Sequence, residues 1–283
     1  MFTLKIETIN GDIFELTHNT RNYAIIGIQG LTPPATAINT ATAGTIDGTF
    51  FNSARVEQRN LVIDIVLNGD IEGNRQRLYK IFPRKVPCTI YFSNKNRNVQ
   101  IKGYVETLEG DLFSQREQMQ ISIICPRPYF EDMETIYTEL SLIVAMFEFP
   151  FSISTPIPFS EIVEYPLCTI NNDGDTACGC TMTISISGDV TGLKIYNSTQ
   201  QNFFGFDYSF EAGDTITINT SSGSMGATLD RNGVQSNLLN YVTKGSTWFR
   251  LSLGDNDFTF TADGDGAENV KIIFATANLY GGV

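Results

Sequence analysis

Three cysteines in the second half of the chain come nearest to the spacing of a metal site. Cys168, Cys178 and Cys180 could supply thiolate ligands. A structural zinc site needs four ligands, usually in two closely spaced pairs, and no second pair accompanies these three. We therefore expect no metal and no cofactor. A Cys178–Cys180 or Cys168–Cys180 disulfide stays open only for an oxidising environment.

A nucleophilic catalytic site would lack its base. His18 is the only histidine, and it follows a predicted strand in a predicted turn. A Ser-His-Asp or Cys-His arrangement would have to use it, and nothing near it in sequence supports that role. Gly223 and Gly226 stand among serines, but no Gly-Lys-Ser or Gly-Lys-Thr follows, so they do not form a phosphate-binding loop. The sequence predicts a protein without catalytic residues, not an enzyme.

Aspartates alternate with glycine in two places, Asp173-Gly174-Asp175 and Asp263-Gly264-Asp265-Gly266. Both resemble fragments of calcium loops, but neither has the full ligand run or the terminal bidentate glutamate of an EF-hand. Asp-Gly pairs commonly form hairpin turns. We interpret both segments as turns of a β protein.

The single tryptophan is the one candidate glycan contact. Trp248 lies in a predicted strand, 247–253, and strand alternation places it on the same face as Arg250. Phe249 and Leu251 fall on the other face. An exposed tryptophan could stack on a sugar ring, whereas a core or edge tryptophan buries a large apolar area. Both readings stay open, and the second is favoured.

Composition and charge indicate two different β domains. The 283 residues suit two domains, and glycine, proline, aromatic and β-branched residues outweigh helix-period runs. Residues 1–130 hold 14 Lys+Arg and 12 Asp+Glu, a net +2, whereas residues 131–283 hold 5 and 19, a net −14. The acidic half should be repelled by nucleic acid and by membrane phosphates. No signal peptide or bilayer-length apolar run is visible, which predicts synthesis in a cytoplasm.

The first half contains the best-defined elements. A β-hairpin opens the chain around Asn10-Gly11, and a helix is predicted over residues 72–82, where Leu78, Ile81 and Phe82 share one face. The basic side chains in and after this helix are expected on a solvated or protein-binding face, because no aromatic stacking array accompanies them. They are Arg75, Arg77, Lys80, Arg84 and Lys85.

Residues 35–54, rich in Ala, Thr, Gly and Asn, are predicted to form a long loop that could reach a neighbouring subunit. Cys88 and Cys125 fall in apolar strand patterns and are expected to be buried thiols. Residues 131–165 are expected to be a linker with irregular strands. Beyond it, short strands at roughly ten-residue spacing predict an antiparallel sandwich. These strands are predicted at 181–187, 192–197, 203–210, 215–219, 226–230, 247–253, 257–262 and 269–275.

With these elements in place, several segments resemble the distal tail proteins of bacteriophages with long non-contractile tails and of prophages. The strongest runs from Gln118 to Phe130 and ends in Cys-Pro-Arg-Pro-Tyr-Phe. An extra aspartate, Asp255, departs from the usual Gly-Asn turn of the family. The other matching pieces are Gly30–Pro34, Asp47-Gly48 with Phe51, Arg59–Ile63, Gly69-Asp70, Arg75–Phe82, Gly103–Glu106, Phe113-Ser114, Ala212–Asp214, Asn232-Gly233, Leu253–Asn256 and Tyr280–Val283.

The resemblance implies a mostly β protein: an N-terminal β-barrel or sandwich with one helix, residues 1–130, and a peripheral galectin-like sandwich, residues 131–283. It implies a structural protein of the virion tail tip, made in the bacterial host cytoplasm. There it would form a homo-hexameric ring that joins the tail tube protein to the tail-tip hub or tail-associated lysin and supports host attachment.

The resemblance also implies contact with a receptor-binding protein or host glycans. The acidic second half and the absence of a bilayer-length apolar run predict no binding of nucleic acid or membrane. Two alternatives of other classes remain at this point. One is a carbohydrate-binding module that contributes to host adsorption, and the other is a hydrolase.

Overall fold

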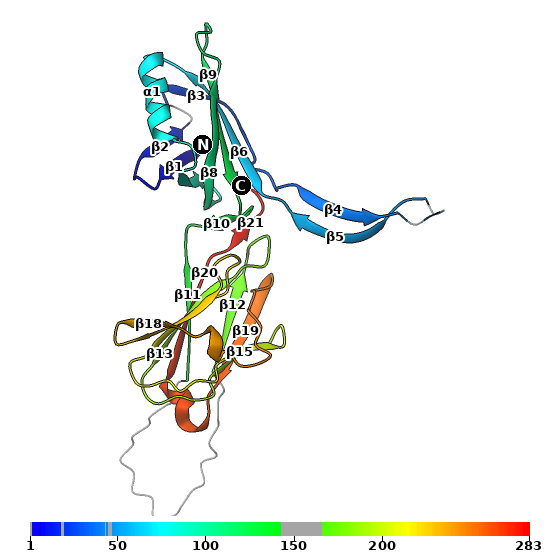
Figure 1. The fold of residues 1–283 in the computed structure, drawn as a ribbon, viewed down its shortest axis with the longest axis vertical. Helices are drawn as coiled ribbons and strands as arrows, with labels where there is room; N and C mark the ends of the chain where they lie inside the picture. The colour runs from blue at the N-terminus through cyan, green and yellow to red at the C-terminus, as the bar shows by residue number, and fades with distance from the viewer. Residues whose placement is uncertain (1, 18–19, 43, 45–46, 143–165) are drawn as a thin grey trace, which may run out of the picture. The chain divides into compact units, whose positions relative to one another are not determined.

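The computed structural model describes residues 2–17, 20–42, 44, 47–142 and 166–283, and these divide into two compact units (Figure 1). Unit 1 comprises residues 1–134 together with 279–283, and unit 2 comprises residues 135–278. The sequence predicts a single domain boundary, near residue 130. In the structure the last five residues belong to unit 1, so unit 2 is an insertion between two segments of it.

The core of unit 1 is enclosed by one antiparallel nine-stranded sheet in the order β2-β1-β7-β8-β9-β6-β3. The long strand β8 pairs with β7 through its first half and with β9 through its second half, and a bulge between Val105 and Thr107 bends it. β10 pairs with the start of β8, and β21 pairs with β10. The strands are β1 (Thr3–Thr8), β2 (Ile13–Thr17), β3 (Tyr23–Gln29), β6 (Arg59–Leu67), β7 (Pro87–Ser93), β8 (Asn98–Gly110), β9 (Gln118–Cys125), β10 (Phe130–Asp132) and β21 (Leu279–Tyr280).

The only α-helix in the described residues, α1 (Ile71–Ile81), forms where its period and caps predict it. Asp70 accepts a hydrogen bond from the backbone N–H of Gly73 at 3.0 Å, which caps the helix start. Leu78 and Ile81 are buried in the core of unit 1. Phe82 follows the helix and packs edge-on against Phe14 at 5.2 Å between ring centroids. The predicted 72–82 helix is therefore confirmed to within one residue.

The predicted loop over residues 35–54 is wrong, because most of it forms a two-stranded antiparallel ribbon. β4 (Thr36–Ala41) pairs with β5 (Phe50–Val56), and Glu57 N–H donates to the carbonyl of Ala35 at the base. The ribbon projects from unit 1 (Figure 1). The segment has a weak hydrophobic pattern because the ribbon buries almost nothing within its own chain. Threonine, isoleucine, valine and phenylalanine nevertheless favour extended backbone.

A buried arginine joins the distant segments of unit 1. Arg59, at the start of β6, is 2% exposed. Its guanidinium donates to the carbonyl of Pro128 at 2.7 Å and to that of Thr32 at 2.8 Å. It also donates to the carbonyls of Gly30 and Gly281, and it lies 4.4 Å above the centre of the Phe130 ring. Four backbone acceptors and an aromatic face thus replace the water that this charge loses on burial.

The segments around Arg59 approach one another closely at two glycines, Gly30 and Gly282. Gly30 has φ +85°, and a Cβ there would lie 2.1 Å from the carbonyl oxygen of Asn60. A Cβ on Gly282 would lie 3.1 Å from the carbonyl of Leu31. The chain end is fixed further by Arg97, which donates to the Gly282 carbonyl at 2.8 Å.

Unit 2 is an antiparallel sandwich of two sheets, six-stranded β11-β20-β13-β16-β17-β18 and four-stranded β12-β19-β14-β15. Phenylalanines fill the space between them: Phe258 of β19 lies 4.8 Å from Phe274 of β20 and 5.4 Å from Phe249, measured between ring centroids. The strands are β11 (Ile136–Ser141), β12 (Leu167–Asn172), β13 (Cys180–Ile186), β14 (Lys194–Asn197), β15 (Asn202–Gly205), β16 (Thr215–Asn219), β17 (Gly226–Arg231), β18 (Val234–Asn237), β19 (Gly254–Thr261) and β20 (Val270–Thr276), with 3₁₀ turns η1 (Leu239–Tyr241) and η2 (Gly264–Asn269).

Three expectations for the second half need correction. Residues 136–141 of the predicted linker form β11, a regular edge strand paired with β20, and residues 143–165 lie outside the described residues. The predicted strand 247–253 is not a strand; only Leu251 makes a bridge, to Cys178. The predicted strand 203–210 stops at Gly205, after which Phe206 and Phe210 form isolated bridges. In both segments buried apolar side chains alternate with more exposed ones, which is the sequence pattern of a strand although the backbone is not one.

Arg59→Ala should destabilise unit 1 by about 3 kcal/mol or more, because it leaves several buried carbonyls without a donor. Trp248 is the only tryptophan and lies in unit 2, so its fluorescence follows unit 2 alone. We expect urea unfolding of the variant to show an early transition by circular dichroism and an unchanged transition by tryptophan fluorescence.

The matched control for this experiment is Arg55→Ala, since Arg55 is exposed on the ribbon, and its effect should stay within about 0.5 kcal/mol. Equal shifts of both signals in Arg59→Ala would show that Arg59 does not act on unit 1 specifically.

Candidate functional site

One face of the β4–β5 ribbon carries an apolar stripe. Directly paired residues share a face, and the pairs Thr36/Val56, Ile38/Ala54 and Thr40/Phe51 alternate with pairs that face the other way. Ile38 is 62% exposed and Phe51 is 67% exposed. The opposite face carries Arg55, Asn39 and Phe50 among smaller side chains. We call the Ile38, Ala54, Phe51 and Val56 surface the ribbon stripe.

A second exposed apolar feature of unit 1 is the turn between β8 and β9, residues 111–117, which includes Leu112 and Phe113. The turn is fixed by Glu117, which is buried and accepts a hydrogen bond from the backbone N–H of Phe113 at 3.0 Å. Arg75 of α1 donates to both carboxylate oxygens of Glu117, at 2.8 and 3.0 Å. This N–H and the Arg75 guanidinium hold the pKa of Glu117 below its usual range.

The pairing with Glu117 corrects part of the expected basic face. Arg75 is buried and also pairs with Glu72, whereas Arg77, Lys80, Arg84 and Lys85 are exposed as expected. The expectation that Arg75 lies on another face than Leu78 is wrong, because three residues separate them and the helix period places them side by side. The acidic partner of Arg75 lies 42 residues further along the chain, so sequence spacing could not reveal the pair.

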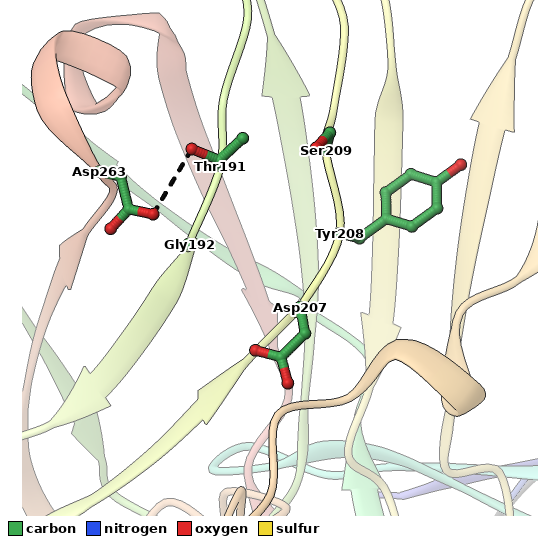
Figure 2. Close-up of a pocket in the computed structure, with 6 residues that line it drawn as sticks. All are labelled: Thr191, Gly192, Asp207, Tyr208, Ser209 and Asp263. Atoms are coloured by element: carbon green, nitrogen blue, oxygen red, sulfur yellow. Dashed lines mark hydrogen bonds between the residues drawn. The ribbon is translucent and has the colours of Figure 1, made fainter.

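Unit 2 has an open polar hollow of about 600 Å³ where β14 and β15 separate beyond their pairing (Figure 2). Thr191 and Asp263 approach each other across one side, with 3.5 Å between hydroxyl and carboxylate oxygens. The ring of Tyr208 points away from them. Asp207 accepts a hydrogen bond from the Thr243 hydroxyl at 2.8 Å.

The side chains that line the hollow are polar. Its six lining residues include two carboxylates and three hydroxyls but no histidine, cysteine, lysine or arginine. The carboxylates can accept hydrogen bonds from hydroxyl or ammonium groups. Gly192 makes the close approach of Asp263 feasible, because it has φ +62° and a Cβ there would lie 2.3 Å from the carboxylate.

Trp248 is not among the residues that line the hollow. Its ring is half-buried and packs on the buried Phe204, with ring centroids 4.7 Å apart. The neighbours Phe249 and Leu251 point into the core, and Arg250 is exposed, so the predicted alternation holds although the backbone is not a strand. The exposed part of the Trp248 ring is the surface that a sugar could contact.

The five cysteines are all buried free thiols, as expected for Cys88 and Cys125. Burial raises the pKa of Cys88, Cys168 and Cys178 to about 11, and that of Cys125 and Cys180 to about 12. The disulfides left open for Cys168, Cys178 and Cys180 are not formed.

Neither aspartate-glycine segment assembles a metal site in the described part of the chain, where no group of three or more His, Cys, Asp or Glu side chains could hold an ion. Asp263 instead precedes η2 and lines the hollow. His18 lies outside the described residues. No helix among the described residues is long and apolar enough to cross a membrane.

The described residues form two β units, and unit 1 carries a projecting ribbon with exposed apolar side chains. Residues 173–277 match the family model of the siphovirus-type tail component, C-terminal domain. No curated protein matches the sequence.

The fold of nearly the whole chain is similar to that of solved phage tail structures. The structure of the phage SPP1 Dit protein, described as a paradigm of the hub adsorption apparatus in phages that infect Gram-positive bacteria, is similar with a TM-score of 0.69 and 14% identity; the match covers 98% of this chain and 99% of that one. Chains from two phage P2 baseplate structures, activated with Ca and with Sr, give TM-scores of 0.51 and 0.52 at 12% and 10% identity, each covering at least 97% of both chains.

These comparisons support the distal tail family that the sequence motifs indicate. The mostly β fold with a single main helix is confirmed. The family model lies within unit 2, whereas the motifs were clearest in unit 1.

The thiols should be unreactive in the folded protein. A thiol with a pKa of 11 or 12 stays protonated at pH 8, and the thiolate is the reactive form. We expect a disulfide reagent such as DTNB to titrate less than one thiol per chain at pH 8, and all five in denaturant. Rapid labelling of one or more cysteines in the native protein would contradict the burial described above.

Proposed function

We propose that this chain is a structural, non-enzymatic protein of the phage tail tip, where six copies close into a ring between the tail tube and the tail-tip hub or baseplate. The observation that carries this proposal is the match of the whole chain to the SPP1 Dit fold together with the tail-component family match of unit 2. The partners follow from this role: copies of the chain, the tail tube protein, the hub or tail-associated lysin, and a receptor-binding protein or host glycans that support attachment.

The surfaces of unit 1 support a ring contact. A two-stranded ribbon is marginally stable in water by itself, and the ribbon stripe leaves several apolar side chains in solvent. Packing the stripe against a neighbour would remove this surface from water and fix the ribbon. Unit 1 holds 14 Lys+Arg and 15 Asp+Glu, a net charge of −1, so copies of it repel one another little.

The proposal is tested by imaging the protein at high concentration and in assembled tails, where closed six-membered rings are expected. A second measurement tests the contact. Ile38→Ser combined with Phe51→Ser should lower the self-association constant, measured by light scattering, about tenfold or more. The two substitutions remove the large apolar side chains from the ribbon stripe. Circular dichroism should stay unchanged, since neither side chain is in the core.

The matched control is Phe50→Ser, which removes a similarly exposed phenylalanine from the opposite face of the ribbon. It should leave association within twofold of wild type. A ring of other symmetry, an open filament, or equal loss in Phe50→Ser and in the stripe variant would contradict the proposed contact.

A second candidate function is glycan binding by unit 2, and the half-exposed ring of Trp248 is the observation in its favour. Glycan-array binding by the wild-type chain that Trp248→Ala abolishes would support it. Tyr241→Ala is the control, because Tyr241 is another exposed aromatic of the same unit. For the structural role alone we expect no glycan binding and a loss of about 2 kcal/mol of unit 2 stability in Trp248→Ala.

A further inference from the structure

Phe113 is the most exposed large apolar side chain of the described residues, at 87%. It lies at the end of the β8–β9 hairpin, which extends beyond the sheet of unit 1 (Figure 1). Leu112 beside it is also exposed. Isolated exposed apolar residues are ordinary on protein surfaces, so exposure by itself does not indicate a contact.

The backbone at Phe113 is held in an unfavourable conformation. Its φ is +63°, in the left-handed region that is uncommon for a bulky residue and that asparagine or glycine adopts more readily. The hydrogen bond from its N–H to the buried Glu117 keeps it there, and Glu117 is held in turn by Arg75. The turn itself is closed by Asp111 N–H on the Gln118 carbonyl and by the Ser114 hydroxyl on the Asp111 carbonyl.

The unfavourable backbone conformation at Phe113 is offset by few contacts of its side chain within the same chain. The Phe113 ring makes one cation–π approach, 5.6 Å from Arg75, and is otherwise in solvent. A fixed loop that presents an aromatic ring has the form of a binding anchor, because the ring is already ordered and loses little entropy on contact.

We propose that Phe113, with Leu112, is an anchor that packs on the ribbon stripe of a second copy of this chain. The inference rests on the proposed ring. A head-to-tail contact that closes a ring needs two different, complementary surfaces on each copy. Unit 1 carries both surfaces, the turn with Phe113 and Leu112 and the ribbon stripe. Its net charge of −1 allows copies to approach one another.

The first test is Phe113→Asn in the full-length chain. Asparagine tolerates positive φ, so the unfolding midpoint should stay the same or rise, while the self-association constant should fall about tenfold or more. The matched control is Ile9→Asn, which removes another highly exposed apolar side chain of unit 1 and should leave association unchanged. A clear fall in the unfolding midpoint of Phe113→Asn would assign Phe113 a structural role and overturn the proposal.

The second test identifies the occupant. A photoreactive phenylalanine, benzoylphenylalanine, placed at position 113 should cross-link two copies in assembled protein, with the adduct mapping to residues 36–56. Cross-links elsewhere on the second copy, or to a different tail protein in assembled tails, would overturn the proposal. If the wild-type chain forms rings and Phe113→Asn forms them equally well, the anchor is wrong and the ring stands. If the wild-type chain forms no ring even in tails, the proposed function fails and the anchor with it.

Discussion

The buried guanidinium of Arg59 is the constraint on which unit 1 depends. A charge removed from water needs several polar partners, and these partners come from segments far apart in sequence: Gly30 and Thr32, Pro128, and Gly281. The Phe130 ring covers one face of the same group. The Arg59 site therefore fixes the exit of β3, the return after β9 and the chain terminus at one place. The β10–β21 pairing, Arg97 and a hydrogen bond from the Val283 N–H to the Leu31 carbonyl at 3.1 Å also hold the last five residues.

This junction also explains which motifs made the sequence recognisable. The pieces Gly30–Pro34, Arg59–Ile63, Cys125–Phe130 and Tyr280–Val283 are scattered along the chain, and each contributes to the surroundings of Arg59. Their residue types follow from the geometry: glycine where backbones approach closely, and arginine where carbonyls converge. A sequence motif was visible there because backbone carbonyls and a buried charge permit few substitutions.

Local signals predicted local structure well. The Asp70 cap and the Leu78, Ile81 and Phe82 face located α1, and period-two alternation located most strands of both units. Non-local partners could not be predicted. The burial of Arg75 depends on Glu117, and the place of β21 in unit 1 depends on a chain return across 144 residues of unit 2. The ribbon was missed because its strands lack a buried face, which is the main pattern by which a strand is detected. The polar hollow was not predicted: the Asp263–Gly266 segment was noted as a turn, but nothing in the sequence spacing joins Asp263 to Thr191 and Asp207.

The charge distribution sets a limit on how copies of this chain can meet. Unit 2 holds 5 Lys+Arg and 16 Asp+Glu, a net −11, so six copies carry −66, whereas six copies of unit 1 carry −6. Exposed charges are screened only beyond about 8–10 Å at ordinary salt, so close contacts between copies of unit 2 would be opposed by this repulsion. The apolar features without a partner in their own chain that we assign to self-contact, the ribbon stripe and the Phe113 turn, both belong to unit 1. Charge thus favours unit 1 as the part of the chain that closes the proposed ring, and the two apolar features that we assign to this contact lie in the same unit.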